Sequence, residues 1–413
     1  MQSQRAVGLV GRRHRVAHRR RHRRPASGGA QVTVHEAVRL RSALADQLAQ
    51  AGSLRGPGWR DAVESVARER FLGSAIAGAT EYGDRWKVIH RDEVTEDEWL
   101  ELAYRNETWV TQIDGNSVEG ARGTITGMPT SSSTMPGLVV LMLEAAQISD
   151  SDKVLEVGTG TGYSTALMCH RLADKGVTSI EYDPAVADRA RDALTAVGYM
   201  PTLVTGDGLA GYDKNAEYGR LIATCSVRYV PMPWMWQVRD GGTITAPLIG
   251  WMRGAAFAHL TLGDDGTASG RFLEDDIYFM TARPHGPPPV ASPYLASGEV
   301  GESRVDPRVL DSPAGLFVAQ LAAPSAMRLG GGDEVILWDV ATGSQAVTGP
   351  DPAGGWTVRQ RGPLRLWDAV EDAILVWQSA GSPHQSAYGL TVTGDRQYVW
   401  LGEPDGPSWD LPV

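Results

Sequence analysis

The stretch VLEVGTGTGYSTA, residues 154–166, has the composition of a ligand-binding turn. Its apolar start predicts a buried strand, and Gly158, Gly160 and Gly162 follow before a helical pattern begins. Glycines let the backbone turn sharply and approach a ligand closely. Glycine loops of this kind bind nucleotides, flavins and S-adenosylmethionine (SAM), so their spacing alone leaves the ligand open.

Three acidic residues narrow the choice of ligand. Glu156 lies at the end of the first strand, where a carboxylate would repel a pyrophosphate but could attract the cationic methionine part of SAM. Glu181 ends the next strand, 23 residues after Gly158 (181 − 158), the usual place for an acid that accepts from ribose hydroxyls. Asp207, after the third strand, can accept from the exocyclic amine of adenine. The pattern predicts a SAM-binding Rossmann-like domain; an α/β fold with these acids merely on its surface is the alternative.

Strand-like and helical patterns alternate from residue 151 onward, which is typical of a parallel α/β sheet. An antiparallel finish is expected in the AFAHLTL and RFLEDDIYFM segments. Ahead of this region, amphipathic helices are expected over residues 32–52, 59–72 and 92–106. Thr95 and Glu98 are spaced as a capping box at the start of the third helix.

From residue 34 to residue 249 the chain resembles the protein-L-isoaspartate O-methyltransferase family. VLEVGTGTGYSTA resembles its first SAM motif, SIEYD its second and TGDG its third. TMPGLVVLMLE resembles the segment just before the SAM domain, where repair enzymes carry a TISAPHM-type active-site sequence. The resemblance implies a SAM-dependent methyltransferase with N-terminal helices, which releases S-adenosylhomocysteine. The cofactor-binding residues that it implies are Glu156, Gly158, Thr159, Gly160, Gly162, Tyr163, Glu181, Tyr182, Asp207, Gly208 and Thr224.

A run of five hydroxyl side chains, residues 130–134, occupies the position of that active-site sequence. Ser132, Ser133 and Thr134 align with the family's T-I-S. A carboxylate is anionic near neutral pH, so methylating it mainly requires that one oxygen be held in line with the methyl group. Hydroxyls can do this without the bidentate grip of an arginine. We therefore predict that these three residues bind a substrate carboxylate; the alternative is a loose loop whose last hydroxyl caps the following helix.

Several departures from the repair enzymes resemble a specialised branch of the family. They are the serine run, Gly137 in place of the family's histidine, the ATCSV strand and a C-terminal extension containing WLGEPDGPSW. That branch is found with ribosomally made, modified peptides (lanthipeptides, lasso peptides and graspetides). Its members methylate an aspartate of a constrained precursor peptide, and the ester then closes to an aspartimide. The resemblance implies this activity, with an already cyclised precursor peptide as the partner. Repair of isoaspartyl damage, or a non-catalytic SAM- or peptide-binding scaffold, are the alternatives.

The 413 residues are enough for two or three domains. A proline-rich run at residues 282–293 predicts a boundary between a methyltransferase domain, residues 32–285 with its SAM core at 150–282, and an accessory α+β domain, residues 294–413. The accessory domain is expected to recognise the peptide. Residues 1–31 are expected to be a disordered leader. A nucleic-acid-binding tail, a targeting peptide and a start codon placed too far upstream remain alternatives for this leader.

Charge and cysteine usage exclude some classes of protein. Nine arginines lie in the first 24 residues, which leaves 30 basic residues (39 − 9) against 49 acidic ones, a balance of −19. So acidic a body repels phosphate backbones, which disfavours nucleic acid as a partner.

No apolar run in the sequence reaches the roughly 18 residues of a membrane helix. Cys169 and Cys225 suggest neither a disulfide framework nor a zinc site, so a reducing cytoplasm is expected. Cys225 is predicted to be a packing thiol rather than a nucleophile. The sequence leaves the oligomeric state open.

Overall fold

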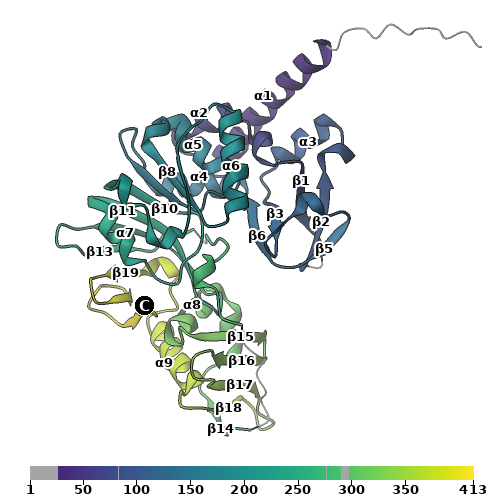
Figure 1. Ribbon diagram of the computed structural model, residues 1–413. Coiled ribbons are helices and arrows are strands. Elements are labelled where there is room, and N and C mark those ends of the chain that lie inside the picture. The colour runs from purple at the N-terminus through teal and green to yellow at the C-terminus, as the bar shows by residue number, and fades with distance from the viewer. Residues whose placement is uncertain (1–26, 82, 276, 290–296) are drawn as a thin grey trace, which may run out of the picture.

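The computed structural model describes residues 27–81, 83–275, 277–289 and 297–413. Within these residues the chain forms an elongated molecule built on three β-sheets (Figure 1). Most of the arginine-rich leader, residues 1–26, lies outside the described residues. Helix α1 (Ser27–Gln50) includes the last five residues assigned to that leader, so regular structure begins before residue 32.

The second and third N-terminal helices are shorter than expected. Helix α2 (Pro57–Ser65) ends within the segment expected to be helical over residues 59–72, and a short 3-10 helix, η1 (Arg68–Phe71), follows. Helix α3 (Glu96–Ala103) begins with the predicted capping box, which is confirmed: the Thr95 hydroxyl accepts from the Glu98 N–H at 3.2 Å, and the Glu98 carboxylate accepts from the Thr95 N–H at 2.7 Å.

The first sheet lies beside these helices and contains the hydroxyl-rich run. Its strands are ordered β4-β3-β1-β2-β5, with β6 paired antiparallel to β3. Ser132 is opposite Val110 and Ser133 is opposite Trp109. The strands of this sheet are β1 (Ala75–Ala79), β2 (Arg85–His90), β3 (Trp109–Ile113), β4 (Asn116–Ser117), β5 (Thr124–Thr126) and β6 (Pro129–Ser133).

Helix α4 (Pro136–Ala145) follows β6 and is capped from a distant turn. The side chain of its N-cap residue, Met135, makes no capping hydrogen bond. The Gly137 N–H donates to Asn106 Oδ1 at 2.7 Å, and the Met135 N–H donates to Thr108 Oγ1 at 3.0 Å. The hydroxyl run is therefore a strand rather than a loose loop, and it does not cap this helix.

The central sheet confirms the expected Rossmann-like α/β fold. Five parallel strands, in the order β9-β8-β7-β10-β11, continue into antiparallel strands β12, β13, β19, β20 and β21. Helices α5 (Tyr163–Leu172), α6 (Pro184–Ala196) and α7 (Met232–Gln237) connect the parallel strands. The strand bounds are β7 (Val154–Val157), β8 (Val177–Glu181), β9 (Thr202–Thr205), β10 (Tyr218–Ala223), β11 (Val238–Ile249), β12 (Ala255–Leu262), β13 (Ala268–Arg271), β19 (Tyr388–Val392), β20 (Gln397–Leu401) and β21 (Ser408–Asp410).

The third sheet forms a separate module at one end of the molecule, together with helices α8 (Pro313–Ala322) and α9 (Leu366–Ser379) (Figure 1). It is antiparallel, with the strand order β14-β18-β17-β16-β15. Its strands are β14 (Glu299–Ser303), β15 (Ala326–Gly331), β16 (Glu334–Asp339), β17 (Gln345–Pro350) and β18 (Trp356–Arg361).

The module does not include the C-terminal strands. β19 pairs antiparallel with β13, with Leu390 opposite Gly270, so residues 388–410 extend the central sheet. The boundary expected at residue 294 therefore does not separate two independent sheets. The module of residues 299–379 is instead inserted between two neighbouring strands of the central sheet.

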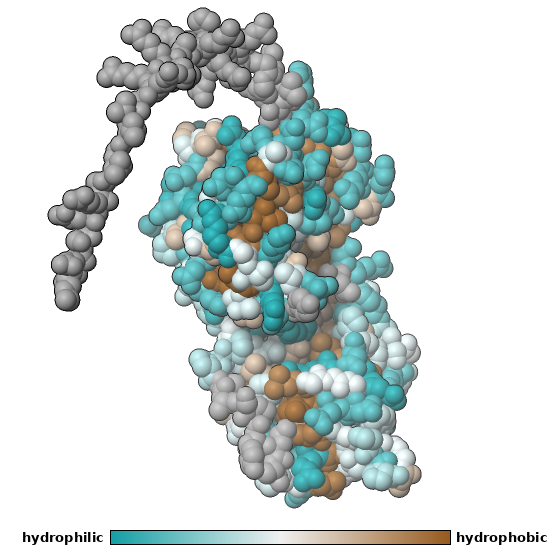
Figure 2. Space-filling model, turned by 90° about the vertical axis from the view of Figure 1, so that its right-hand side faces the viewer, coloured by the Kyte–Doolittle hydropathy of each residue, from teal (hydrophilic) through white to brown (hydrophobic). Residues whose placement is uncertain are grey.

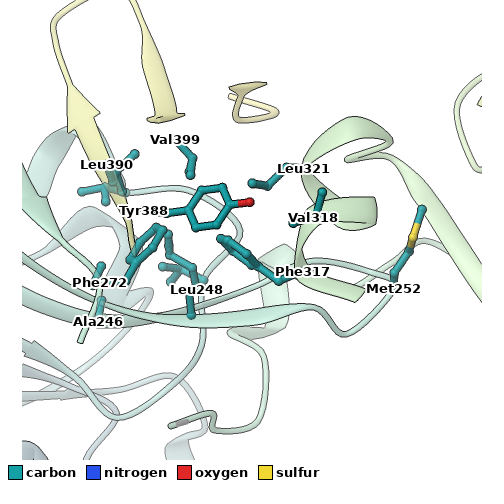
Figure 3. Packing of buried hydrophobic residues seen from close by; sticks show 14 of the residues in the cluster. Ala246, Leu248, Met252, Phe272, Phe317, Val318, Leu321, Tyr388, Leu390 and Val399 are labelled. Carbon is teal, nitrogen blue, oxygen red and sulfur yellow. The ribbon is translucent and has the colours of Figure 1, made fainter. Parts of the chain in front are cut away.

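An aromatic cluster joins the module to the central sheet (Figure 3). The ring of Tyr388 packs edge-on against Phe317 of α8 at 5.4 Å, and Phe317 packs edge-on against Phe272 at 5.6 Å. Figure 2 shows that both ends of the molecule present hydrophobic patches on a largely polar exterior. Among the described residues, every helix is too short or too polar to cross a membrane.

Candidate active site

A cavity of about 140 Å³ lies at the carboxyl ends of the parallel strands. Such edges are where open α/β sheets bind ligands. Three walls enclose it: the glycine-rich turn, the hydroxyl strand β6 and a segment that follows β13. Its lining residues are Thr130, Ser131, Ser132, Thr134, Val139, Val157, Gly158, Thr159, Gly160, Thr161, Tyr163, Ser164, Ile180, Glu181, Tyr182, Asp207, Gly208, Leu209, Thr224, Cys225, Phe279, Met280, Thr281, Ala282 and Arg283.

The glycine-rich turn needs its glycines for space and for backbone conformation. Gly158 and Gly160 have φ values of +102° and +56°. A Cβ on Gly158 would lie 2.5 Å from Thr224 Oγ1, a hydroxyl that donates to the Val157 carbonyl at 3.1 Å. A side chain here would therefore displace the end of β10 and fill the cavity.

Glu181 ends β8 at the floor of the cavity and organises two loops. One carboxylate oxygen accepts from the Gly160 N–H at 2.9 Å and the other from the Asp183 N–H at 3.0 Å. Burial raises the pKa of Glu181, against the lowering effect of these two bonds. Each oxygen keeps a second lone pair, so the carboxylate can still accept from ribose hydroxyls.

Glu156 lies beneath the cavity rather than in its lining. It is fully buried, and its carboxylate accepts from Thr165 at 2.5 Å, from Ser179 at 2.7 Å and from Ser164 through a short hydrogen bond. Burial raises the pKa of Glu156 to about 7. The carboxylate thus braces the glycine turn. Because Glu156 lies outside the lining, it does not reach the cavity, where its expected contact with the methionine part of SAM would be made.

The buried Glu156 carboxyl should make stability depend on pH. Its pKa is higher in the folded than in the unfolded protein, so the native state binds more protons between the two values. The free energy of unfolding should therefore fall as pH rises from about 4.5 to about 7, by at most about 3 kcal/mol. Urea unfolding at about pH 5 and about pH 8 would measure this change. E156Q should lack this component, and an identical pH profile in both proteins would contradict the assignment.

The remaining predicted cofactor residues are mostly brought together at the cavity. Thr159, Tyr163, Tyr182, Gly208 and Thr224 all contribute to its lining.

Asp207 and Gly162 complete that set. Asp207 lines the cavity, and its side chain accepts from the Leu209 N–H at 3.0 Å. Gly162 lies outside the lining, at the N-cap of α5, where an added Cβ would lie 3.3 Å from Leu194.

The three predicted carboxylate-binding residues separate into two groups. Ser132 and Thr134 line the cavity, whereas Ser133 is 1% exposed and its hydroxyl accepts from Arg68 at 3.4 Å. Ser132 and Ser133 are neighbours in β6, and successive side chains of a strand point to opposite faces. The Ser132 carbonyl oxygen lies 3.6 Å from the position of a Cβ on Gly160. Strand β6 and the glycine-rich turn therefore meet in one cavity.

Sequence reasoning missed the third wall, residues 279–283. Arg283 lines the cavity, donates to Asp183 Oδ2 at 2.9 Å and to Gln112 Oε1 at 3.1 Å, and lies over the Tyr182 ring. The Thr130 hydroxyl donates to the same Gln112 oxygen at 2.8 Å. One network therefore joins β6 to the loop after β8. The segment falls just before the proline-rich run, and no motif of the sequence pointed to it.

Ser226 fixes this third wall against the end of β10. It follows Cys225 in the ATCSV stretch and is fully buried. Its N–H donates to the Met280 carbonyl at 3.0 Å, and its carbonyl accepts from the Ala282 N–H at 2.8 Å. Its hydroxyl also donates to the Phe279 carbonyl at 2.9 Å.

Burial raises the pKa of the Cys225 thiol to about 12, which disfavours a thiolate nucleophile at neutral pH.

Among the described residues, His, Cys, Asp and Glu side chains form no cluster that could hold a metal ion.

The parallel sheet, the glycine-rich turn and the acids at the strand ends give the chain the fold of the Rossmann-like SAM-dependent methyltransferases. Residues 84–278, just under half of the chain, match the family described as Protein-L-isoaspartate(D-aspartate) O-methyltransferase (PCMT). This part of the chain is therefore similar to that family in sequence as well as in fold.

Curated relatives and one solved structure agree with this match. The chain is 42% identical over 115 residues to the protein-L-isoaspartate O-methyltransferase of Ignicoccus hospitalis, covering 27% of this chain and 54% of the relative. It is 34% identical over 154 residues to that of Dictyoglomus turgidum, covering 37% and 62%. The chain thus spans about half the length, or somewhat more, of the curated relatives it matches. A solved protein-L-isoaspartate O-methyltransferase covers 88% of this chain and 100% of its own, with a TM-score of 0.52 and 18% identity.

Proposed function

We propose that this chain is a SAM-dependent carboxyl O-methyltransferase that acts on an aspartyl-type carboxylate of a peptide. The observation that carries the proposal is the meeting of β6 with the glycine-rich turn, where the Ser132 carbonyl lies 3.6 Å from the Cβ position on Gly160. The cavity fits SAM chemically, because Glu181 and Asp207 offer acceptors for a ribose and an amine. Bound SAM supplies an electrophilic methyl group.

The residues of this chain have a simple task in such a reaction. The carboxylate is already anionic at neutral pH, so no general base is needed. Ser132 and Thr134 line the cavity. In this proposal they donate to one carboxylate oxygen and leave the other free to attack the methyl carbon. The third wall, which Ser226 holds, is proposed to shield the reacting groups from water on the opposite side. Orientation and partial desolvation then account for the rate.

We further propose that the substrate is an aspartate of a constrained, ribosomally made peptide. Methylation converts a poor leaving group into methoxide, and the next amide nitrogen can then attack the ester and release methanol as an aspartimide forms. The hydroxyl strand and Gly137 support this reading. A Cβ on Gly137 would lie 2.8 Å from the Asn106 side chain, so the space of the family's histidine is already filled.

Isoaspartyl repair is the second candidate, and the comparisons favour it equally. The matched family is named for that substrate. The solved protein with that name covers 88% of this chain, more than the methyltransferase domain alone, so the inserted module does not separate the two candidates.

Mass spectrometry with SAM and two substrates tests both candidates. One substrate is a short linear isoaspartyl peptide, and the other is the cyclised precursor peptide encoded beside the gene. If only the precursor gains a methylene and then loses methanol, for a net loss of one water, aspartimide formation is supported. Methylation of the isoaspartyl peptide alone would establish repair. No methyl transfer to either peptide would overturn the proposed activity and favour a non-catalytic scaffold.

Substitutions in β6 test which hydroxyls bind the carboxylate. S132A removes a donor in the cavity, and a hydrogen bond to a charged group is worth about 1.5–3 kcal/mol. We expect kcat/KM for the peptide to fall by about tenfold or more. S133A is the matched control, since Ser133 faces Arg68, and its loss should be less than about threefold. A larger effect of S133A than of S132A would contradict this placement.

The inserted module is proposed to recognise the peptide outside the reacting residue. Deleting residues 294–413 would not test this, because it would remove three strands of the central sheet. Val300 and Leu329 are a better target: they are 59% and 47% exposed, on the face of the module's sheet opposite the buried Val358 and Leu337.

The double variant V300D/L329D tests this role. We expect the KM for the precursor to rise by about threefold or more, since charged side chains weaken apolar contacts. The affinity for S-adenosylhomocysteine should not change. An unchanged KM would remove the module's exposed face from peptide recognition.

A further inference from the structure

Arg68 is a fully buried cation surrounded by main-chain carbonyl groups. It belongs to η1 and is 0% exposed. Its guanidinium donates to five carbonyl oxygens, those of Ala103 at 2.6 Å, Arg105 at 3.1 Å, Glu107 at 3.0 Å, Ser133 at 3.3 Å and Thr134 at 3.2 Å. Three of these lie at the end of α3 and in the turn that follows it, and two lie at the end of β6 and just after it.

This guanidinium forms no ion pair with a carboxylate among the described residues, although the nearby Glu107 carboxylate raises its pKa slightly against the effect of burial. The carboxylate nearest in sequence, Glu69, accepts a short hydrogen bond from Tyr104 instead. Burial lowers the pKa of Arg68 to about 10, so the side chain remains protonated at neutral pH. Carbonyl dipoles solvate the charge but do not neutralise it. An unpaired buried charge is expensive, and buried arginines are usually paired with an acid.

The charge lies directly behind the wall of the candidate active site. Arg68 donates to the carbonyl of Thr134, and Thr134 lines the cavity. Ser132, two residues earlier, lines it too. Tyr163 also lines the cavity, and its ring centroid is 5.9 Å from the Arg68 guanidinium carbon. One layer of residues therefore separates this cation from the place where the proposed substrate carboxylate would bind.

The hydrogen bonds of Arg68 also set the direction of the peptide groups in that wall. The carbonyls of Ser133 and Thr134 point toward the guanidinium. Carbonyl oxygens that pointed into the cavity would repel an anion there. The hydroxyls of Ser132 and Thr134 can therefore donate to an anion in the cavity, and these two carbonyl dipoles do not repel it.

We propose that Arg68 is a positioning residue that makes the cavity selective for an anionic substrate. It turns the carbonyls of Ser133 and Thr134 away from the cavity. It also places a positive charge that has no direct carboxylate partner behind the wall that receives the carboxylate. It does so at a distance, so the carboxylate oxygen stays free of the direct arginine contact that would quench its reactivity. This inference rests on the proposed function, because it assumes that a carboxylate binds beside Ser132.

Binding of two matched peptides separates this role from a merely structural one. One peptide carries the reacting carboxylate and the other carries asparagine in its place, and calorimetry measures both affinities in the presence of S-adenosylhomocysteine. In R68Q the preference for the carboxylate over the amide should fall by about tenfold, from the loss of one charge across a partly buried wall. R68K keeps the charge and should retain most of the preference, although its thermal stability should fall.

An equal loss of affinity for both peptides in R68Q would overturn the inference and leave Arg68 a structural residue. If R68Q does not fold, the wild-type protein supplies the deciding measurement. The pKa of a ¹³C-labelled carboxylate in the bound peptide should be lower than in the free peptide, and an unchanged or higher pKa would overturn the inference. Failure of the wild-type protein to bind or methylate either peptide would instead count against the proposed function itself.

Discussion

Replacing Glu181 by alanine should weaken the binding of S-adenosylhomocysteine by about 100-fold or more. The carboxylate is the acceptor expected for two ribose hydroxyls, and each hydrogen bond to a charged group contributes about 1.5–3 kcal/mol. It also holds the Gly160 and Asp183 N–H groups, at 2.9 and 3.0 Å, so its loss would loosen both loops around the ligand. Titration calorimetry with S-adenosylhomocysteine measures the change directly.

E181Q and D188A complete this experiment. The glutamine keeps the size and one acceptor oxygen but loses the charge, so a loss of about tenfold is expected. Asp188 is an exposed acid on α6 that pairs with Arg191, and D188A should leave the affinity unchanged. A dissociation constant for E181A within about threefold of the wild-type value would remove Glu181 from the cofactor site.

Replacing Tyr388 by alanine should lower the free energy of unfolding by about 3–5 kcal/mol, as for other large aromatic residues in cores. Its ring is 1% exposed and packs between Phe317 of α8 and Trp409 of β21, where the module meets the central sheet (Figure 3). The cavity left behind would open the contact between the inserted module and the sheet. Urea unfolding followed by circular dichroism measures the change.

Y388F is the matched control. Within the described residues the Tyr388 hydroxyl is buried without a hydrogen-bond partner. Removing it deletes an unsatisfied polar group while the ring packing stays, so stability should be unchanged or slightly higher. A loss of more than about 1 kcal/mol in Y388F would show that the hydroxyl has a partner, such as a bound water.

The sequence could predict the cofactor half of the site because local pattern determines it. The first strand runs directly into the glycine-rich turn, and Glu181 is the last residue of the next strand. The parallel sheet then brings Glu181 and Asp207 to the same edge, where both line the cavity. The substrate half depends on β6, which pairs with β3 about 20 residues earlier. Hydroxyl runs have weak strand propensity, so nothing local indicated that Ser133 would face inward.

Three further differences involve long-range contacts. The apolar spacing of residues 59–72 is helical, yet the helix ends at Ser65, where Val66 takes an extended conformation. Arg68 then reaches carbonyls of two distant segments. Composition placed a boundary near residue 294, but composition cannot show that β19 will pair with β13 across the inserted module. Residues 279–283 lacked a motif because their place in the site depends on backbone bonds to Ser226.

The pairing of β13 with β19 also has a consequence for synthesis of the chain. The edge of β13 is finished 117 residues (388 − 271) before its partner begins. At roughly 5–20 residues per second, a ribosome would leave that edge without its partner for about 6–23 s. Unpaired edges invite association with other chains. We therefore expect slower translation through the module to lower the yield of soluble protein, even though the completed sheet is equally stable.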